Sequence, residues 1–254
     1  MPSAAGTHAA PHQDAPHQDA RHPDAPYEVT SRAAPARGRV KLVLHHGIVT
    51  GVIPGGTRLV PASIAEELSV STRPVRDALK ELATEGFVRL DARGGAVVHE
   101  LCRTELEDLF QIRRLLEPLT TARAATCASS ASILAAGQLI AAMDTETDPA
   151  RWAEHNSRFH HLIGEVGSSP RMVAILANLR ELSTRYVTHS VVSAPEQARS
   201  GNTEHREILR AVIARDPAAA AEATVRHLDR RLGQLLSVHP VDASRPAARR
   251  GEAR

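Results

Sequence analysis

The chain has 254 residues, which is enough for two modest domains that each have a core of their own. A formal net charge of +2 and an aromatic content of 2% argue against a protein that coats nucleic acid indiscriminately or stacks the bases of single strands. Its two cysteines, Cys102 and Cys127, have no metal-ligand spacing and no disulfide-rich context. Because no apolar run resembles a signal peptide or a membrane span, we expect a cytoplasmic protein without membrane association.

Both ends of the chain have compositions that are typical of disorder. Residues 1–38 contain PHQDAPHQDARHPDAP, a five-residue repeat with almost nothing to bury. Its histidines could hold a metal loosely, although a low-complexity tail is the simpler interpretation. Residues 239–254 are rich in Ala, Pro and Arg. We expect a disordered basic tail that either touches DNA phosphates or only aids solubility.

Residues 64–82, IAEELSVSTRPVRDALKEL, predict two helices separated by a tight turn. Apolar residues recur at i, i+1, i+4 before the break and at i, i+3, i+4, i+7 after it. Ser71 or Thr72 can cap the second helix, and Arg73 and Arg76 are neighbours on one face of its first turn. A helix-turn-helix presents this end to the major groove of DNA. A solvated basic helix end in any small helical unit would give the same pattern.

The flanking sequence adds a third helix and a β-hairpin. Upstream, LHHGIVTGVIPGGTRL predicts an amphipathic helix followed by a Gly/Pro loop. Downstream, the second helix ends at Gly86, and strands at 87–90 and 96–98 enclose a turn at 91–95. The fold expected over 39–100 is a winged helix-turn-helix. These segments, together with AEELSVSTRPVRDALKELATEGFV and RGGAVV, resemble the linker, recognition and wing motifs of the GntR family of bacterial transcription regulators.

The resemblance implies which residues contact DNA, with Arg76 in the recognition helix and Gly95 at the wing tip. The family usually has Val-Ser-Arg-Thr-Pro-Val-Arg where this chain has VSTRPVR, so the Arg and the Thr are transposed. A preceding position that is often Arg in the family is Ala62 here. The operator could therefore differ from family norms. The full set of expected DNA-binding residues is Ser71, Thr72, Arg73, Arg76 and Gly95.

From residue 104 to 238 the pattern changes to helices without strands, which predicts an all-α antiparallel bundle. Thr104 and Glu107 form a possible capping box for a long first helix, and Pro118 inside that helix could kink it. Pro- and Gly-containing breaks separate the later helices. These helices are expected over 131–143, from 149, from 170, over 195–214 and from 217. The whole chain is thus expected to be mainly α.

Four side chains of the predicted bundle could meet around one ion. Asn156 and His160 are i, i+4 on one helix face, and His205 and His227 lie eleven residues before and after Asp216. Two antiparallel helices joined there would hold both imidazoles at the same height. Imidazole is the usual ligand of zinc and related divalent metals. The alternative is a set of ordinary core histidines, since the chain contains 14 histidines.

The bundle resembles the effector-binding and dimerisation domain of the FadR-like (FCD) branch of the same family. NSRFHHLIGEVGSSPRM is similar to that branch's Asp-x-x-x-His helix, and EHREILRAVIARDPAAAAEATVRHL to its two-histidine hairpin. In metal-binding members an aspartate and three histidines are the ligands, which implies a divalent metal, with zinc as the first candidate. An asparagine brings no negative charge, so metal affinity or preference could change. The matching residues are Asn156, His160, His205 and His227.

Arg113, in QIRRLLEPL, matches the branch's arginine on the first bundle helix. A guanidinium in an apolar bundle near a metal suits the binding of a small carboxylate effector. The alternative is an ion pair with Glu117, its i+4 neighbour, or with another acidic residue of the bundle.

The leading hypothesis is a homodimeric repressor that binds double-stranded operator DNA under the control of that carboxylate. A metal-responsive regulator, in which the ion itself is the signal, is one alternative. A metalloenzyme is another, because three imidazoles and an open position can activate water. No His-Glu-x-x-His motif or evident general base supports catalysis, so we expect no enzymatic activity.

Overall fold

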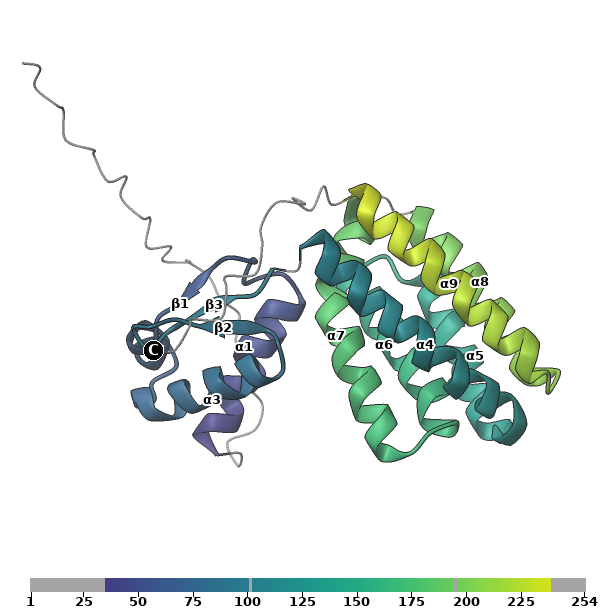
Figure 1. Ribbon diagram of the computed structural model, residues 1–254, viewed down its shortest axis with the longest axis horizontal. Coiled ribbons are helices and arrows are strands. Elements are labelled where there is room, and N and C mark those ends of the chain that lie inside the picture. Colours follow the sequence, from purple (N-terminus) through teal and green to yellow (C-terminus); the bar gives the residue numbers. More distant parts are fainter. Residues whose placement is uncertain (1–34, 101, 194–195, 239–254) are drawn as a thin grey trace, which may run out of the picture.

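The computed structural model of the protein describes residues 35–100, 102–193 and 196–238. Both predicted tails lie outside these ranges, apart from residues 35–38. The first helix already begins at Ala36, inside the segment expected to be tail. Two large clusters of buried apolar side chains form separate cores, one for each of the two bodies visible in Figure 1.

The first body is the expected winged helix. Helix α3 buries its apolar stripe, and Val75, Ala78, Leu79 and Leu82 are almost fully inaccessible. The three strands form an antiparallel sheet in the order β1-β3-β2. Strand β1 was predicted as loop, because two residues are too few to show an alternating pattern. The elements are α1 (Ala36–Val49), β1 (Arg58–Leu59), α2 (Pro61–Glu67), α3 (Thr72–Thr84), β2 (Val88–Leu90) and β3 (Ala96–Val98).

The second body is the expected helical bundle. Helix α9 runs beside α4 and α8, and α6 packs between α5 and α7 (Figure 1). Trp152 and Phe159 of α6 and Leu228 of α9 are among its most buried side chains. Within the described residues none of the helices is long and apolar enough to cross a bilayer. The elements are α4 (Arg103–Cys127), α5 (Ser130–Thr145), α6 (Pro149–Val166), α7 (Pro170–Ser193), α8 (Glu196–Ile213) and α9 (Pro217–Val238).

The capping box of α4 lies two residues before the predicted one. Cys102 is the N-cap, and its N–H donates to the Glu105 carboxylate at 2.9 Å. Glu107 instead pairs with Arg103, one turn earlier on the exposed face, also at 2.9 Å. The prediction placed the cap at Thr104 because a hydroxyl is the commoner capping group. The helix also continues through Pro118 without ending there.

One face of α7 packs against the winged helix. The side-chain amide of Asn178 donates to the backbone carbonyl of Glu85 at 3.0 Å, and Glu181 contacts the His45 ring at 3.3 Å. Leu182 packs against the winged-helix core. It lies beside Gly86, whose φ of +88° suits a residue without a side chain. The two bodies therefore share apolar and polar contacts through this helix.

Candidate functional site

The predicted DNA-reading end of α3 is open to solvent. Ser71 is the N-cap, and Ser71, Arg73 and Arg76 are exposed, whereas Thr72 is half-buried. Neither arginine forms an ion pair or hydrogen bond with any residue that the structure describes. The buried stripe of α3 faces the core, so both guanidinium groups project from the opposite side. This end of the helix can therefore offer two uncompensated cations to a nucleic acid.

The structure places Gly95 at the base of the wing and not at its tip. Gly95 is buried, and a Cβ on it would lie 2.8 Å from the backbone oxygen of Leu59. Its N–H donates to the Asp91 carboxylate at 2.9 Å, as does the N–H of Arg93 at 2.8 Å. The prediction failed because a Gly-Gly pair does not show which glycine makes the turn. The exposed tip is formed by residues 92–94, so Arg93 is the wing side chain better placed to reach DNA.

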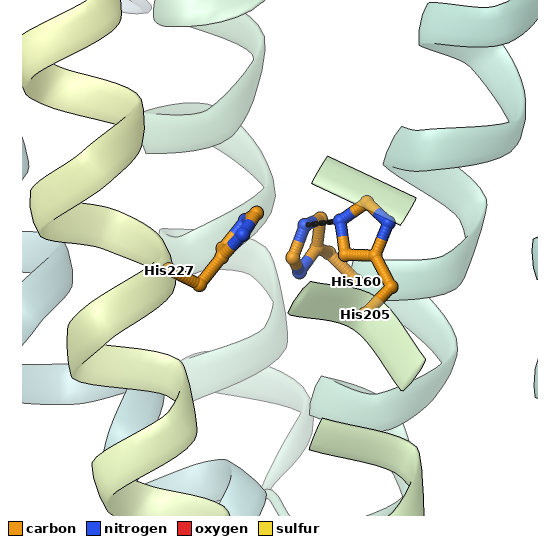
Figure 2. A group of neighbouring side chains, drawn as sticks. All are labelled: His160, His205 and His227. Atoms are coloured by element: carbon orange, nitrogen blue, oxygen red, sulfur yellow. Dashed lines mark hydrogen bonds between the residues drawn. The ribbon is translucent and has the colours of Figure 1, made fainter. Parts of the chain in front are cut away.

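Three of the four predicted metal ligands converge in the bundle. Figure 2 shows the rings of His160 from α6, His205 from α8 and His227 from α9 turned toward one another. Their ligand atoms lie within 4.8 Å of each other. The two Nε2 atoms of His160 and His205 are 3.2 Å apart, close to the ~3.3 Å between two nitrogen ligands on a tetrahedral zinc ion. The ring centroids of His205 and His227 are 4.9 Å apart, which confirms that the two lie at the same height.

The fourth predicted ligand, Asn156, lies at the same place. It lines a small cavity together with His160 and His227, and the volume of this cavity is about 20 Å³. Its Oδ1 atom is buried and has no hydrogen-bond partner among the described residues. Leaving such an oxygen unsatisfied costs roughly 1–3 kcal/mol, and a bound cation would remove this cost. The cavity has room for one water-sized occupant. The residues therefore fit a single divalent ion.

The three imidazoles are held in the neutral form that binds metals. Burial lowers the pKa of His160 and of His205 well below the ordinary value, and repulsion between the rings lowers each further. Burial also lowers the pKa of His227, against the opposing effect of the Glu204 carboxylate 2.8 Å from Nδ1. That hydrogen bond keeps the ring proton on Nδ1, so the lone pair on Nε2 is available to the cluster.

Arg113 is buried on α4 at the edge of the same cavity, and it forms the ion pair that the sequence offered as an alternative. Its Nε donates to Glu117 at 2.7 Å and its Nη1 to Ser183 at 3.1 Å. Arg180 of α7 contacts both carboxylate oxygens of Glu117, each at 3.2 Å. Burial alone would raise the pKa of Glu117, but the two guanidinium groups outweigh it and lower the pKa to about 2.

Sequence reasoning missed two arginines at this site. Arg231 is 4% exposed and lines the cavity with His227, and its terminal nitrogens have no hydrogen-bond partner among the described residues. Burial lowers its pKa to about 10. Its position one turn after His227 was a usable signal. No signal in the sequence pointed to Arg180, because 63 residues separate it from Glu117.

The fold and the site together define a two-domain regulator, with a winged helix for DNA and a bundle that encloses a polar cavity. Residues 36–98 match the family model "Bacterial regulatory proteins, gntR family", and residues 108–230 match the FCD domain. The chain therefore belongs to the GntR family and carries an FCD domain.

Known relatives agree with this assignment. The gluconate operon transcriptional repressor of Bacillus subtilis (strain 168) is 47% identical over 79 residues, 31% of this chain and 32% of that protein, so the match spans about a third of its length. The HTH-type transcriptional repressor RspR of Escherichia coli (strain K12) is 25% identical over 201 residues, 76% of this chain and 86% of RspR. The solved structure of E. coli McbR/YncC has the same fold, with a TM-score of 0.67 at 19% identity, and the match covers 80% of this chain and 98% of that one.

Proposed function

We propose that this protein is a homodimeric transcriptional repressor whose operator affinity is controlled by a small carboxylate and a divalent metal, zinc, in its bundle. The observation that carries the DNA-binding part is the pair of exposed, unpaired guanidinium groups on α3. Arg76 and Arg73 read base edges, and Ser71, Thr72 and the wing hold phosphates. The names of the relatives, which are repressors, support repression.

The DNA-binding proposal is tested with a duplex that the parent protein selects from random-sequence DNA. Arg76→Ala is expected to weaken binding by about 10- to 100-fold, because a bidentate base contact contributes about 1–3 kcal/mol. Arg171→Ala, an exposed arginine on α7, is the matched control for net charge. If Arg76→Ala and the parent protein bind the duplex with equal affinity in fluorescence anisotropy, the interpretation of α3 as the recognition helix is ruled out.

An apolar stripe on α4 supports the homodimer. Ile112, Leu115 and Leu119 are 44%, 67% and 57% exposed, and they follow one another at helical spacing. Asp108 and Arg123, at either end of the stripe, have no ion pair with a described residue. An antiparallel pairing of two α4 helices centred beside Leu115 sets Ile112 against Leu119 and Asp108 against Arg123. A two-fold axis repeats each contact, so the stripe is complementary to itself.

The dimer is tested by light scattering after gel filtration. Leu115→Asp is expected to give monomers because it places two like charges near the axis of the pairing. Leu134→Asp is the control, since Leu134 is 64% exposed on α5 and lies away from the stripe. A dimer that persists in the first variant excludes α4 as the interface.

The metal proposal rests on the unsatisfied Asn156 oxygen and the three neutral imidazoles. Zinc is expected to raise the unfolding midpoint of metal-stripped protein, since a ligand of the folded state stabilises it by mass action. His205→Ala should abolish that rise, and Asn156→Ala should reduce it. His161→Ala, exposed and adjacent to a ligand, should leave the rise unchanged. A zinc-induced rise that survives His205→Ala would exclude this cluster.

A metal-responsive regulator is the second candidate. The histidine cavity has room for one ion but not for an organic molecule, and Arg113 is already bonded to Glu117 and Ser183. For Arg113 to hold an effector carboxylate, the surrounding side chains must move apart. Operator binding that follows zinc concentration with no organic ligand present would favour this second function.

A further inference from the structure

A second and much larger cavity opens on the bundle surface. Its volume is about 600 Å³, and residues of α5, α6 and α7 line it. Typical small-molecule sites have volumes of ~300–1,000 Å³. The space beside the histidines has about 20 Å³. Of the two cavities, the surface groove is therefore the one that can hold an organic molecule as the structure stands.

A side-chain wall separates the groove from the histidine cavity. Only Ser157 and Arg180 line both spaces. Arg180 is 8% exposed, and its guanidinium forms an ion pair with the buried Glu117 of α4. The Arg180 side chain passes α6 at Gly164, where a Cβ on the glycine would lie 3.4 Å from Nη1 of Arg180. A molecule in the groove therefore meets Arg180 and does not reach the cluster of His160, His205 and His227.

Among the charged side chains that line the groove, Arg158 has no ion-pair partner in the described part of the chain. His161 faces Glu165 at 3.9 Å, and Glu181 contacts His45 at 3.3 Å. Arg180 shares the Glu117 carboxylate with Arg113, and His155 lies 4.0 Å from Glu146. Arg158, on the exposed side of α6, has no ion pair with any described residue. The Arg158 guanidinium is thus open to the anionic group of a ligand.

The wall of the groove also carries an apolar patch. Short or branched aliphatic side chains from all three helices form it, and the rest of the lining is polar. The patch consists of Ala135, Leu139, Ala142, Leu162 and Ala177. An apolar patch beside a guanidinium that has no carboxylate partner suits a molecule that has one negative group and an apolar body. A highly charged metabolite would leave most of its charges without partners there.

We propose that the groove between α5, α6 and α7 binds a small organic monocarboxylate with an apolar body, with the carboxylate on Arg158 and the body against Leu139 and Leu162. This site is distinct from the metal cavity and goes beyond the function proposed above. Glu181 lines the groove and contacts His45 of the winged helix. A ligand in the groove therefore touches the helix through which the two bodies are joined.

Octanoate is a suitable probe, and isothermal titration calorimetry of the full chain is the measurement. Octanoate is expected to bind more tightly than acetate, which lacks the apolar body, and than octan-1-ol, which lacks the charge. Arg158→Ala should weaken octanoate binding about 10-fold or more, the usual effect of losing a charge-assisted hydrogen bond. Ala142→Trp should abolish binding by filling the groove. Arg171→Ala, with the same loss of charge outside the groove, should bind like the parent protein.

Two further conditions separate this site from the metal cavity. Octanoate binding should persist after chelation of metals and in His160→Ala. If binding is lost there but retained in Arg158→Ala, the ligand occupies the histidine cavity, and the groove inference fails while the proposed effector function stands. If zinc does not bind but Arg158-dependent octanoate binding remains, only the metal proposal fails. Failure of both octanoate and benzoate to bind at millimolar concentration overturns the groove inference.

Discussion

Replacing Glu117 with glutamine is the sharpest test of how the bundle core is held together. Glu117 is 1% exposed and is the acidic partner of two buried guanidinium groups, those of Arg113 and Arg180. Glutamine has nearly the same shape but carries no charge, so both arginines would keep their burial cost and lose their counter-charge. Removal of one partner from a buried ion pair typically costs 3–5 kcal/mol. We expect Glu117→Gln to lower the free energy of unfolding by about this much.

The pKa of Glu117 gives the same magnitude and a pH signature. It falls from 4.5 to about 2 on folding. At ~1.36 kcal/mol per pKa unit this corresponds to about 3 kcal/mol of stability. Because the folded-state pKa lies below the unfolded-state value, this stability is fully present above pH 4.5 and is lost as the pH falls toward 2. The difference between Glu117→Gln and the parent protein should therefore shrink over that range.

Urea unfolding followed by tryptophan fluorescence measures this difference. Trp152 is the only tryptophan of the chain and is 2% exposed in the bundle core, so it reports on the domain that contains Glu117. Glu107→Gln is the control, since Glu107 pairs with Arg103 at the same i, i+4 spacing on the exposed face of α4. That pair should contribute only about 0.5 kcal/mol. Equal losses in both variants at pH 7, or a Glu117→Gln loss that does not change with pH, would refute the reasoning.

Two other substitutions test the packing and the cluster. A Cβ on Gly167 would lie 2.1 Å from the backbone oxygen of Thr120. Gly167→Ala should therefore destabilise the bundle by about 3 kcal/mol in the same urea assay. Unchanged stability would contradict the close approach of α6 to α4. Glu204→Gln removes the negative charge that orients His227 and should weaken zinc binding about 10-fold in competition with a chelating dye. Glu222→Gln, on the exposed face of α9, should leave zinc binding unchanged.

Helix boundaries were predictable where a local chemical signal marks them. Asp148 accepts from the N–H of Ala150, and Pro149 begins α6, as the Asp-Pro pair indicated. The equal spacing of His205 and His227 about the turn at Asp216 was enough to bring the two rings together, because a short loop forces the two helices to be antiparallel neighbours.

The features that escaped prediction depend on contacts that are remote in sequence. The approach of Arg180 to Glu117 joins α7 to α4, and no periodic pattern reports which two side chains meet across a bundle. The role of Gly95 depends on the backbone of Leu59 in β1, a strand too short to be recognised. In both cases the residue types were visible, but the partner that gives them their role was not.

Helix α7 connects the candidate ligand sites with the DNA-binding body through residues on its two sides. Arg180 faces the bundle, where it borders both the groove and the histidine cavity. Leu182, two residues or about 200° further around the helix, packs on the winged helix, and Asn178, one turn before it, bonds to Glu85. Because a helix moves as a unit, a ligand that displaces α7 on the bundle side must either shift the winged helix or break these contacts. Operator affinity can then change only by as much as the ligand prefers one arrangement of α7 over the other.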